Sequence, residues 1–183
     1  MRYAGDMVVL ARQWNPELTE YIESRLEGKF QLEINRDKTR IVDLKQERES
    51  LDFLGYTFRY DCDLKGRAKK YLNLFPSEKA LQKEREKLHE MTGSHQCFKP
   101  ISVLISELNR QLKGWANYFS IGYPITAYRQ IDWYVRGRLV QHLRRPSQRP
   151  FRPPQGTSLL QHLQNLRIVL LASKKPAQLP VHA

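Results

Sequence analysis

The sequence has 183 residues, enough for one or two small domains with a hydrophobic core. Its formal net charge is +12, and nearly all of that excess lies in one half of the chain. Residues 1–91 hold 18 Lys and Arg against 17 Asp and Glu, whereas residues 92–183 hold 13 against 2. The asymmetry favours a polyanionic partner that binds the C-terminal half.

Composition also excludes several classes of protein. Two isolated cysteines, Cys62 and Cys97, are too few for a disulfide framework, and no CxxC or HxxxH spacing indicates a zinc site. The longest apolar run, residues 168–172, is much shorter than a membrane span, and the N-terminus lacks the apolar core of a secretion signal. We therefore expect a cytoplasmic protein with no membrane partner.

The first part of the chain predicts a small α+β unit. Residues 2–10 predict a hairpin that turns at Gly5-Asp6, with Leu10 among its core residues. Asn15 and Pro16 predict the start of a helix that ends near Gly28. Later residues predict four more strand segments, at 30–34, 39–44, 51–61 and 67–75, the last two forming a hairpin around residues 63–66.

The second part predicts helices. Ser77 marks the start of a mostly charged helix over 77–91, whose charges we expect to form a solvated face. A helix over 101–119 has an apolar face that recurs with the helical period: Ile101, Leu104, Ile105, Leu108, Leu112, Trp115 and Phe119. A helix over 126–145 is expected to bury Tyr128, Ile131, Val135, Leu139 and His142. Residues 145–156 are too rich in proline for a helix and predict an extended basic arm, followed by a short last helix.

Residues 108–145 mix aromatic and basic side chains unusually densely. Seven of these 38 residues are aromatic and seven are Lys or Arg, with Asp132 the one acid among them. Guanidinium groups pair with phosphates and aromatic rings stack on unpaired bases, so the pattern favours nucleic-acid binding. The alternative is a two-helix core whose polar face happens to be basic. The candidate RNA-binding residues are Arg110, Lys113, Arg129, Trp133, Arg136, Arg138, Arg144 and Arg145.

Four segments, in order, resemble blocks of one family. YAGD at 3–6 looks like the Tyr-Ala-Asp-Asp hairpin of reverse transcriptases, and INRDKTRIVD (34–43) and LDFLGYTFR (51–59) are similar to the next two blocks. LNRQLKGWANYFSIG (108–122), with YRQIDWYVRGRLVQ (128–141), resembles the maturase-specific region of group II intron proteins. The resemblance implies an α+β fold in three parts: a partial polymerase palm over 1–75, a helical thumb and maturase-specific domain over 76–145, and a basic Pro-rich arm with a short C-terminal helix over 146–183.

Two departures from the family bear on catalysis. The polymerase reaction needs two metal ions held by carboxylates, one of which the family places on an earlier strand; the sequence begins at the hairpin, so we expect that ligand to be absent. Gly5 stands where the family has the partner aspartate, which leaves Asp6 as a remnant that could be a metal ligand or a simple turn residue. We therefore expect no intact catalytic residue and no cofactor, with Mg²⁺ bound only if a partner chain restores the polymerase site.

Further family positions lie beside the missing site. By resemblance Lys38 would lie near the incoming nucleotide, and Phe53, Leu54 and Gly55 near the primer end. Without a complete polymerase site, we interpret Lys38 as a solvated turn residue and the other three as ordinary strand packing.

The functional expectation is an RNA-binding maturase remnant. It would bind structured RNA, by resemblance a group II intron, and assist splicing while the RNA performs the chemistry. One alternative is the C-terminal half of a split RNA-directed DNA polymerase that assembles with an N-terminal reverse-transcriptase fragment. Another is a degenerate fragment with no function.

Overall fold

The computed structural model describes residues 2–3, 6–62, 70–144 and 156–173. Contacts divide the chain into two compact units, residues 1–43 and residues 44–183, and each is described by itself. The predicted family boundary after residue 75 falls inside the second unit, and it remains a prediction. Strands and helices both occur, so the predicted α+β class is confirmed.

A short hairpin begins the first unit. Strand β1 (Arg2–Tyr3) pairs antiparallel with β2 (Asp6–Met7), with Tyr3 opposite Asp6. The predicted hairpin is confirmed, but Asp6 lies in a strand rather than in the turn. Gly5, the other predicted turn residue, lies outside the described residues. The predicted core position of Leu10 is wrong, because its side chain is 80% exposed.

The predicted helix follows. Helix α1 (Pro16–Ser24) begins after Asn15, whose side-chain oxygen accepts a hydrogen bond from the Leu18 amide at 2.8 Å. A π-helical turn (Arg25–Lys29) extends it through Gly28. The N-terminal cap is therefore the one that the sequence predicted.

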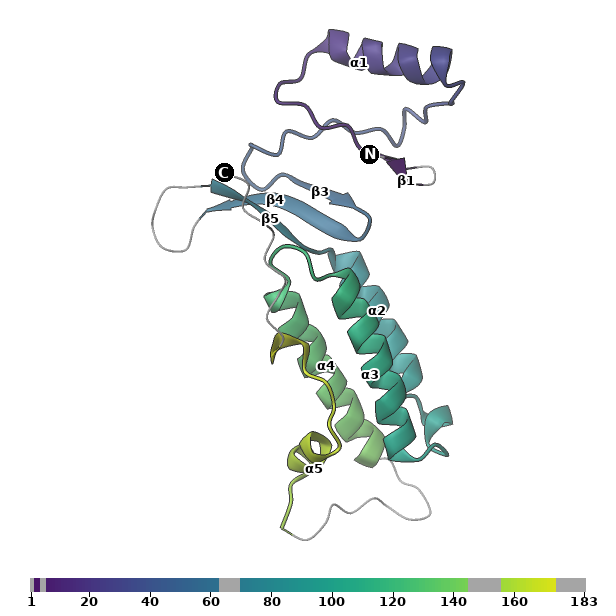
Figure 1. Cartoon of the computed structure of the whole chain (residues 1–183), viewed down its shortest axis with the longest axis vertical. Helices are drawn as coiled ribbons and strands as arrows, with labels where there is room; N and C mark the ends of the chain where they lie inside the picture. Colours follow the sequence, from purple (N-terminus) through teal and green to yellow (C-terminus); the bar gives the residue numbers. More distant parts are fainter. Residues whose placement is uncertain (1, 4–5, 63–69, 145–155, 174–183) are drawn as a thin grey trace. The chain divides into compact units, whose positions relative to one another are not determined.

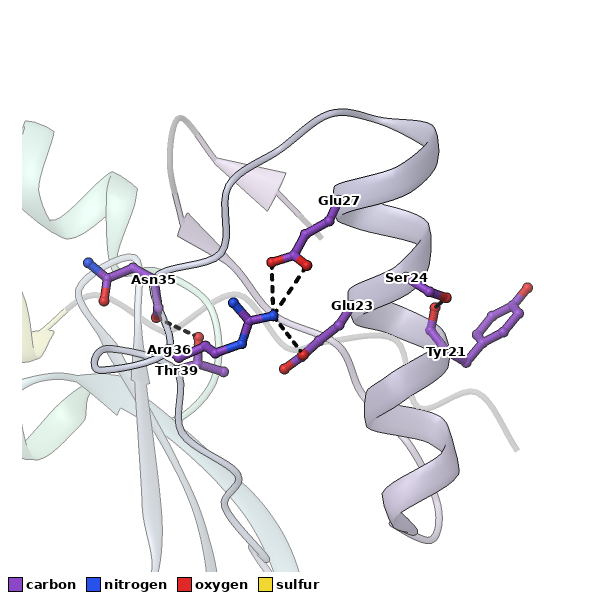
Figure 2. A network of polar contacts seen from close by, with 7 residues as sticks. All are labelled: Tyr21, Glu23, Ser24, Glu27, Asn35, Arg36 and Thr39. Atoms are coloured by element: carbon purple, nitrogen blue, oxygen red, sulfur yellow. Dashed lines mark hydrogen bonds and ion pairs between the residues drawn. The ribbon is translucent and has the colours of Figure 1, made fainter.

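The strands predicted over 30–34 and 39–44 are absent from the described structure. Residues 35–39 form a turn instead, in which the Thr39 amide donates to the Asn35 carbonyl at 3.1 Å. The Arg36 guanidinium lies 3.1 Å from Glu23 and 3.0 Å from Glu27, which ties this turn to α1 and its extension (Figure 2). A strand is stable only when it is hydrogen-bonded to a neighbouring strand. Here no neighbouring strand is present among the described residues, and side-chain contacts to a helix hold the segment instead.

A three-stranded antiparallel sheet begins the second unit. Its strands, in spatial order, are β3 (Ser50–Phe53), β4 (Tyr56–Cys62) and β5 (Lys70–Pro76). Residues 51–61 are therefore not one strand: they form a tight hairpin whose two turn residues, Leu54 and Gly55, have φ of 51° and 77°. Both central residues of a type I′ turn need positive φ, and the first is usually Asn, Asp or Gly. Because Leu54 occupies that position, this turn has no signal in the sequence.

The sheet packs on one end of a helical bundle (Figure 1). Tyr56 is buried, and its ring centroid lies 5.0 Å from that of Phe119. At β5, the Tyr123 amide donates to the Leu74 carbonyl at 2.8 Å. This close approach requires Gly122, which has φ of 84° and at which a Cβ would collide with the Leu74 carbonyl.

The bundle contains α2 (Glu78–Met91), α3 (Ile101–Tyr118) and α4 (Ile125–Arg144) (Figure 1). Every residue predicted to be buried in this part of the chain is buried except Ile101, which is only partly buried. The Tyr128 hydroxyl joins α4 to the C-terminal end of α3: its single proton faces two carbonyls, that of Ala116 at 2.8 Å and that of Phe119 at 3.0 Å. Burial raises the pKa of Tyr128 to about 12, so the hydroxyl stays protonated and able to donate.

Helix α2 is less solvated than its charges suggested. The predicted start at Ser77 is confirmed, since its hydroxyl accepts from the Ala80 amide at 3.3 Å. Glu84, however, is only 4% exposed. One of its carboxylate oxygens accepts from the side-chain amide of Gln111 at 2.8 Å, and the other has no hydrogen-bond partner among the residues described. Burial therefore raises the pKa of Glu84.

The C-terminal segment lies against α3 and α4. It consists of α5 (Leu159–Asn165), a connection and a 3₁₀ turn (Leu171–Ser173). Asn109 accepts from the Val169 amide at 2.8 Å and donates to the Arg167 carbonyl at 3.0 Å.

Asp132 makes the second attachment. Its two carboxylate oxygens accept from the backbone amides of Leu171 at 2.8 Å and Ala172 at 2.9 Å. Asp132 is 7% exposed, and Leu171 is fully buried beside it. A buried carboxylate thus binds the otherwise unpaired amides at the start of a helical turn, where a negative charge is favourable.

Replacing Asp132 by Ala should lower the free energy of unfolding by roughly 3–6 kcal/mol, because two hydrogen bonds to a charged group are lost and each contributes about 1.5–3 kcal/mol. Urea denaturation followed by circular dichroism measures the change. Asp52→Ala is the matched control, since Asp52 is exposed and its side chain bonds only the Thr57 hydroxyl among the described residues. Equal losses in the two variants would contradict this role for Asp132.

The free energy of unfolding of the Glu84→Gln variant should rise relative to that of the parent as pH rises from about 4 to 7. The pKa of Glu84 is higher in the folded state than in the unfolded state, where it is about 4.3. The neutral carboxyl therefore stabilises the folded parent below about pH 4.3, and this stabilisation is lost as pH rises through the folded-state pKa. The amide stays neutral, so the stability of the variant relative to the parent should rise with pH over this range. Thermal unfolding across this pH range tests the prediction, and parallel curves for parent and variant would refute it.

Candidate nucleic-acid interface

The predicted RNA-binding residues lie on two helices. Arg110 and Lys113 are exposed on α3, opposite the stripe that faces the core. On α4, Arg129, Trp133 and Arg144 are exposed and Arg136 is partly exposed, again opposite the buried stripe. Since both helices turn their apolar faces to one core, the two sets point outward, each from its own helix. Arg145 lies outside the described residues.

These cations are not neutralised within the part of the chain that the structure describes. The two acids of α3 and α4 are both engaged elsewhere: Glu107 pairs with Lys99 at 2.9 Å, and Asp132 binds backbone amides. Among the described residues, no hydrogen bond or ion pair engages the side chains of the following cations: Arg110, Lys113, Arg129, Arg136 and Arg144. An unneutralised row of guanidinium groups attracts phosphates.

The side chain of Arg138, which is partly buried, forms hydrogen bonds within the protein. Its guanidinium donates to the Thr92 hydroxyl at 3.1 Å and to Gln141 at 3.0 Å, and reaches the His89 carbonyl at 3.4 Å. His142, which is buried, lies 3.3 Å from the Thr92 carbonyl. Both side chains thus contact the C-terminal end of α2, where the positive charge of Arg138 is favourable. The sequence pattern grouped Arg138 with the exposed cations because it cannot show this contact.

The aromatic residues of this region divide between core and surface. Three of them, Trp115, Phe119 and Tyr128, are buried and form part of the core. Trp133 is 79% exposed and is the most exposed aromatic residue of α4. The dense mixture seen in the sequence is therefore only partly a surface feature, and Trp133 is its principal exposed member on this helix.

Trp133 and Arg129 line an open depression between α2 and α4. Its other lining residues are Arg85, Thr126, Gln130 and Tyr134. Arg85 donates to Gln130 at 2.8 Å and pairs with Glu78 at 3.1 Å. Neither Arg85 nor Gln130 was a predicted site residue, since a contact between positions 45 residues apart has no local signal.

The polymerase-like residues lie only partly within the described structure. No group of three or more His, Cys, Asp or Glu side chains that could hold a metal ion occurs among the described residues. Gly5 and the side chain of Asp6 lie outside the described part of the chain. Lys38 is exposed in a turn, where its amide donates to the Asn35 side chain at 3.2 Å, as interpreted from the sequence. Leu54 and Gly55 form a turn, so their interpretation as strand residues is wrong.

No helix among the described residues is long and apolar enough to cross a membrane. The two cysteines, both exposed, are free thiols.

Comparison with known families identifies the helical part. Residues 81–153 match the family described as group II intron, maturase-specific domain. The match covers most of α2, all of α3 and α4, and every predicted RNA-binding residue. A search of curated proteins found no match. Residues 81–153 therefore resemble a group II intron maturase-specific domain, and the match supports the C-terminal region of a group II intron maturase.

Proposed function

We propose that this chain binds the structured RNA of a group II intron and, by stabilising its folded form, assists splicing while the RNA performs the chemistry. The observation that carries the proposal is the outer face of α4, where Arg129, Arg136 and Arg144 lie unneutralised beside an exposed tryptophan within the maturase-specific domain. RNA recognition commonly combines phosphate contacts with stacking of unpaired bases on aromatic rings. The net charge of +12 supports the same partner.

The proposal assigns no polymerase chemistry to the isolated chain. Gly5 offers no metal ligand where the resemblance would require a carboxylate, and two-metal catalysis needs carboxylates to hold both ions. The competing proposal is a split polymerase whose N-terminal fragment supplies the missing ligands. It differs in outcome, since it requires a second chain and Mg²⁺ for any templated DNA synthesis.

Removing the exposed arginines should weaken RNA binding and reduce its salt dependence. For Arg129→Ala, Arg136→Ala and Arg144→Ala, the slope of log affinity against log salt should fall by about 0.7–0.9 for each phosphate that the protein no longer neutralises. Affinity for a folded group II intron RNA is measured over a salt series by filter binding, with an unrelated structured RNA in parallel.

Arg138→Ala is the matched control on the same helix. Its guanidinium is engaged with Thr92 and Gln141, so this variant should lose stability, by roughly 1 kcal/mol, and keep the parent's salt slope. The proposed RNA surface is wrong if the three exposed variants remain folded and match the parent in both affinity and slope.

A further inference from the structure

The depression between α2 and α4 combines three kinds of group that together fit one ligand class. The indole of Trp133, 79% exposed, offers a flat apolar surface in its wall. Gln130 offers a polar amide, and Arg129 a guanidinium that no acid among the described residues neutralises. An apolar wall with a few polar groups is the general composition of a small ligand site.

The orientation of the Gln130 amide follows from its partner. Arg85 donates to the Gln130 side-chain oxygen at 2.8 Å, and a guanidinium has donors only. The oxygen of the amide must therefore face Arg85, which leaves the amide NH₂ group able to donate to a ligand. Arg85 itself is paired with Glu78 at 3.1 Å, so it adds little net charge to the depression. Its role is to position Gln130.

The ligand that matches is a planar π-system that carries hydrogen-bond acceptors and is attached to an anion. An unpaired nucleotide has all three: a base that stacks on indole, carbonyl or ring-nitrogen acceptors, and a phosphate. A base inside a duplex cannot lie flat on a side chain, so the nucleotide must be unpaired. A hydrophobic side chain of a partner protein would use the indole but would leave Arg129 without a counter-charge.

We propose that this depression holds one unpaired nucleotide of the bound RNA, with its base on Trp133, a base acceptor at the Gln130 amide and its phosphate at Arg129. The proposal rests on the proposed RNA-binding function and deepens it, since it makes the α2–α4 depression a reader of RNA bulges and loops. The remaining exposed cations would then bind backbone phosphates of paired and unpaired RNA alike.

The experiment compares three RNA hairpins: one with a single-nucleotide bulge, the same hairpin with an abasic residue at the bulge, and the fully paired hairpin. All proteins carry Trp14→Phe, because Trp14 is 56% exposed and would otherwise contribute to the fluorescence, whereas Trp115 is buried. Binding is followed by quenching of Trp133 emission and, for variants that lack this residue, by anisotropy of labelled RNA.

Trp133→Ala should weaken binding of the bulged hairpin by roughly 5- to 150-fold, the range expected when one base–aromatic stack is removed. The substitution should not change the affinity for the fully paired hairpin. It should not change the affinity for the abasic hairpin either, because no base is present to stack on Trp133. Gln130→Ala should cost about 2- to 12-fold for the bulged hairpin alone, as for one hydrogen bond. Arg85→Ala should cause a similar loss that does not add to that of Gln130→Ala, since Arg85 acts through Gln130.

The matched control is Phe98→Ala, which removes an aromatic ring of similar exposure, 80%, outside the depression. The bulged hairpin should bind this variant as it binds the parent. The nucleotide site is overturned if Trp133→Ala and Phe98→Ala have equal effects, or if the bulged and abasic hairpins bind the parent equally. In the latter case a protein side chain becomes the better occupant.

The two proposals fail in different ways. If the arginine variants change the salt slope while the bulge gives no advantage, the RNA surface stands and the nucleotide site is wrong. If the parent binds intron RNA no better than an equal charge of heparin, the proposed function itself fails.

Discussion

The buried carboxylate of Asp132 is the constraint on which the arrangement of the helical unit depends. It binds the backbone amides of Leu171 and Ala172, while Asn109 binds the same segment from the neighbouring helix. Asp132 is only 7% exposed, and burying a carboxylate costs free energy of desolvation. The hydrogen bonds to both of its oxygens offset that cost. The C-terminal segment is thereby held over α3 and α4, and the fully buried Leu171 completes their core.

This use of Asp132 also determines the electrostatics of the surface. It is one of only two acids in residues 92–183, and Glu107, the other, pairs with Lys99, so neither is available to the arginines on the outer face of α4. Packing divides the aromatic side chains in a similar way: the Tyr128 hydroxyl faces carbonyls at the C-terminal end of α3 in the core, whereas Trp133, five residues later, lies on the outer face. Unneutralised cations beside an exposed indole are what remain at the surface. That separation, more than the net charge, favours an RNA partner.

The sequence alone determined the main helices, the N-terminal caps of α1 and α2, and most of the buried faces of α3 and α4. Local signals suffice there, because Asn15 and Ser77 cap the helices that follow them and the apolar residues of α3 and α4 recur at the helical period. It also indicated the family, because several segments resemble family blocks in the family's order. Most residues of the candidate RNA surface were likewise identified from the sequence.

Tertiary structure decided what depends on distant partners. Residues 30–34 have a strand-like pattern, but no ladder partner pairs with them in the described structure, and the turn that follows them is tied by Arg36 to a helix instead. Arg138 and Asp132 resemble their surface neighbours in sequence, and only contacts with positions 46 and 39 residues away show that their side chains bond other parts of the chain. The physical reason is the same in each case: a pairing energy between two side chains or backbones exists only once the fold has brought them together, and no local periodicity encodes it.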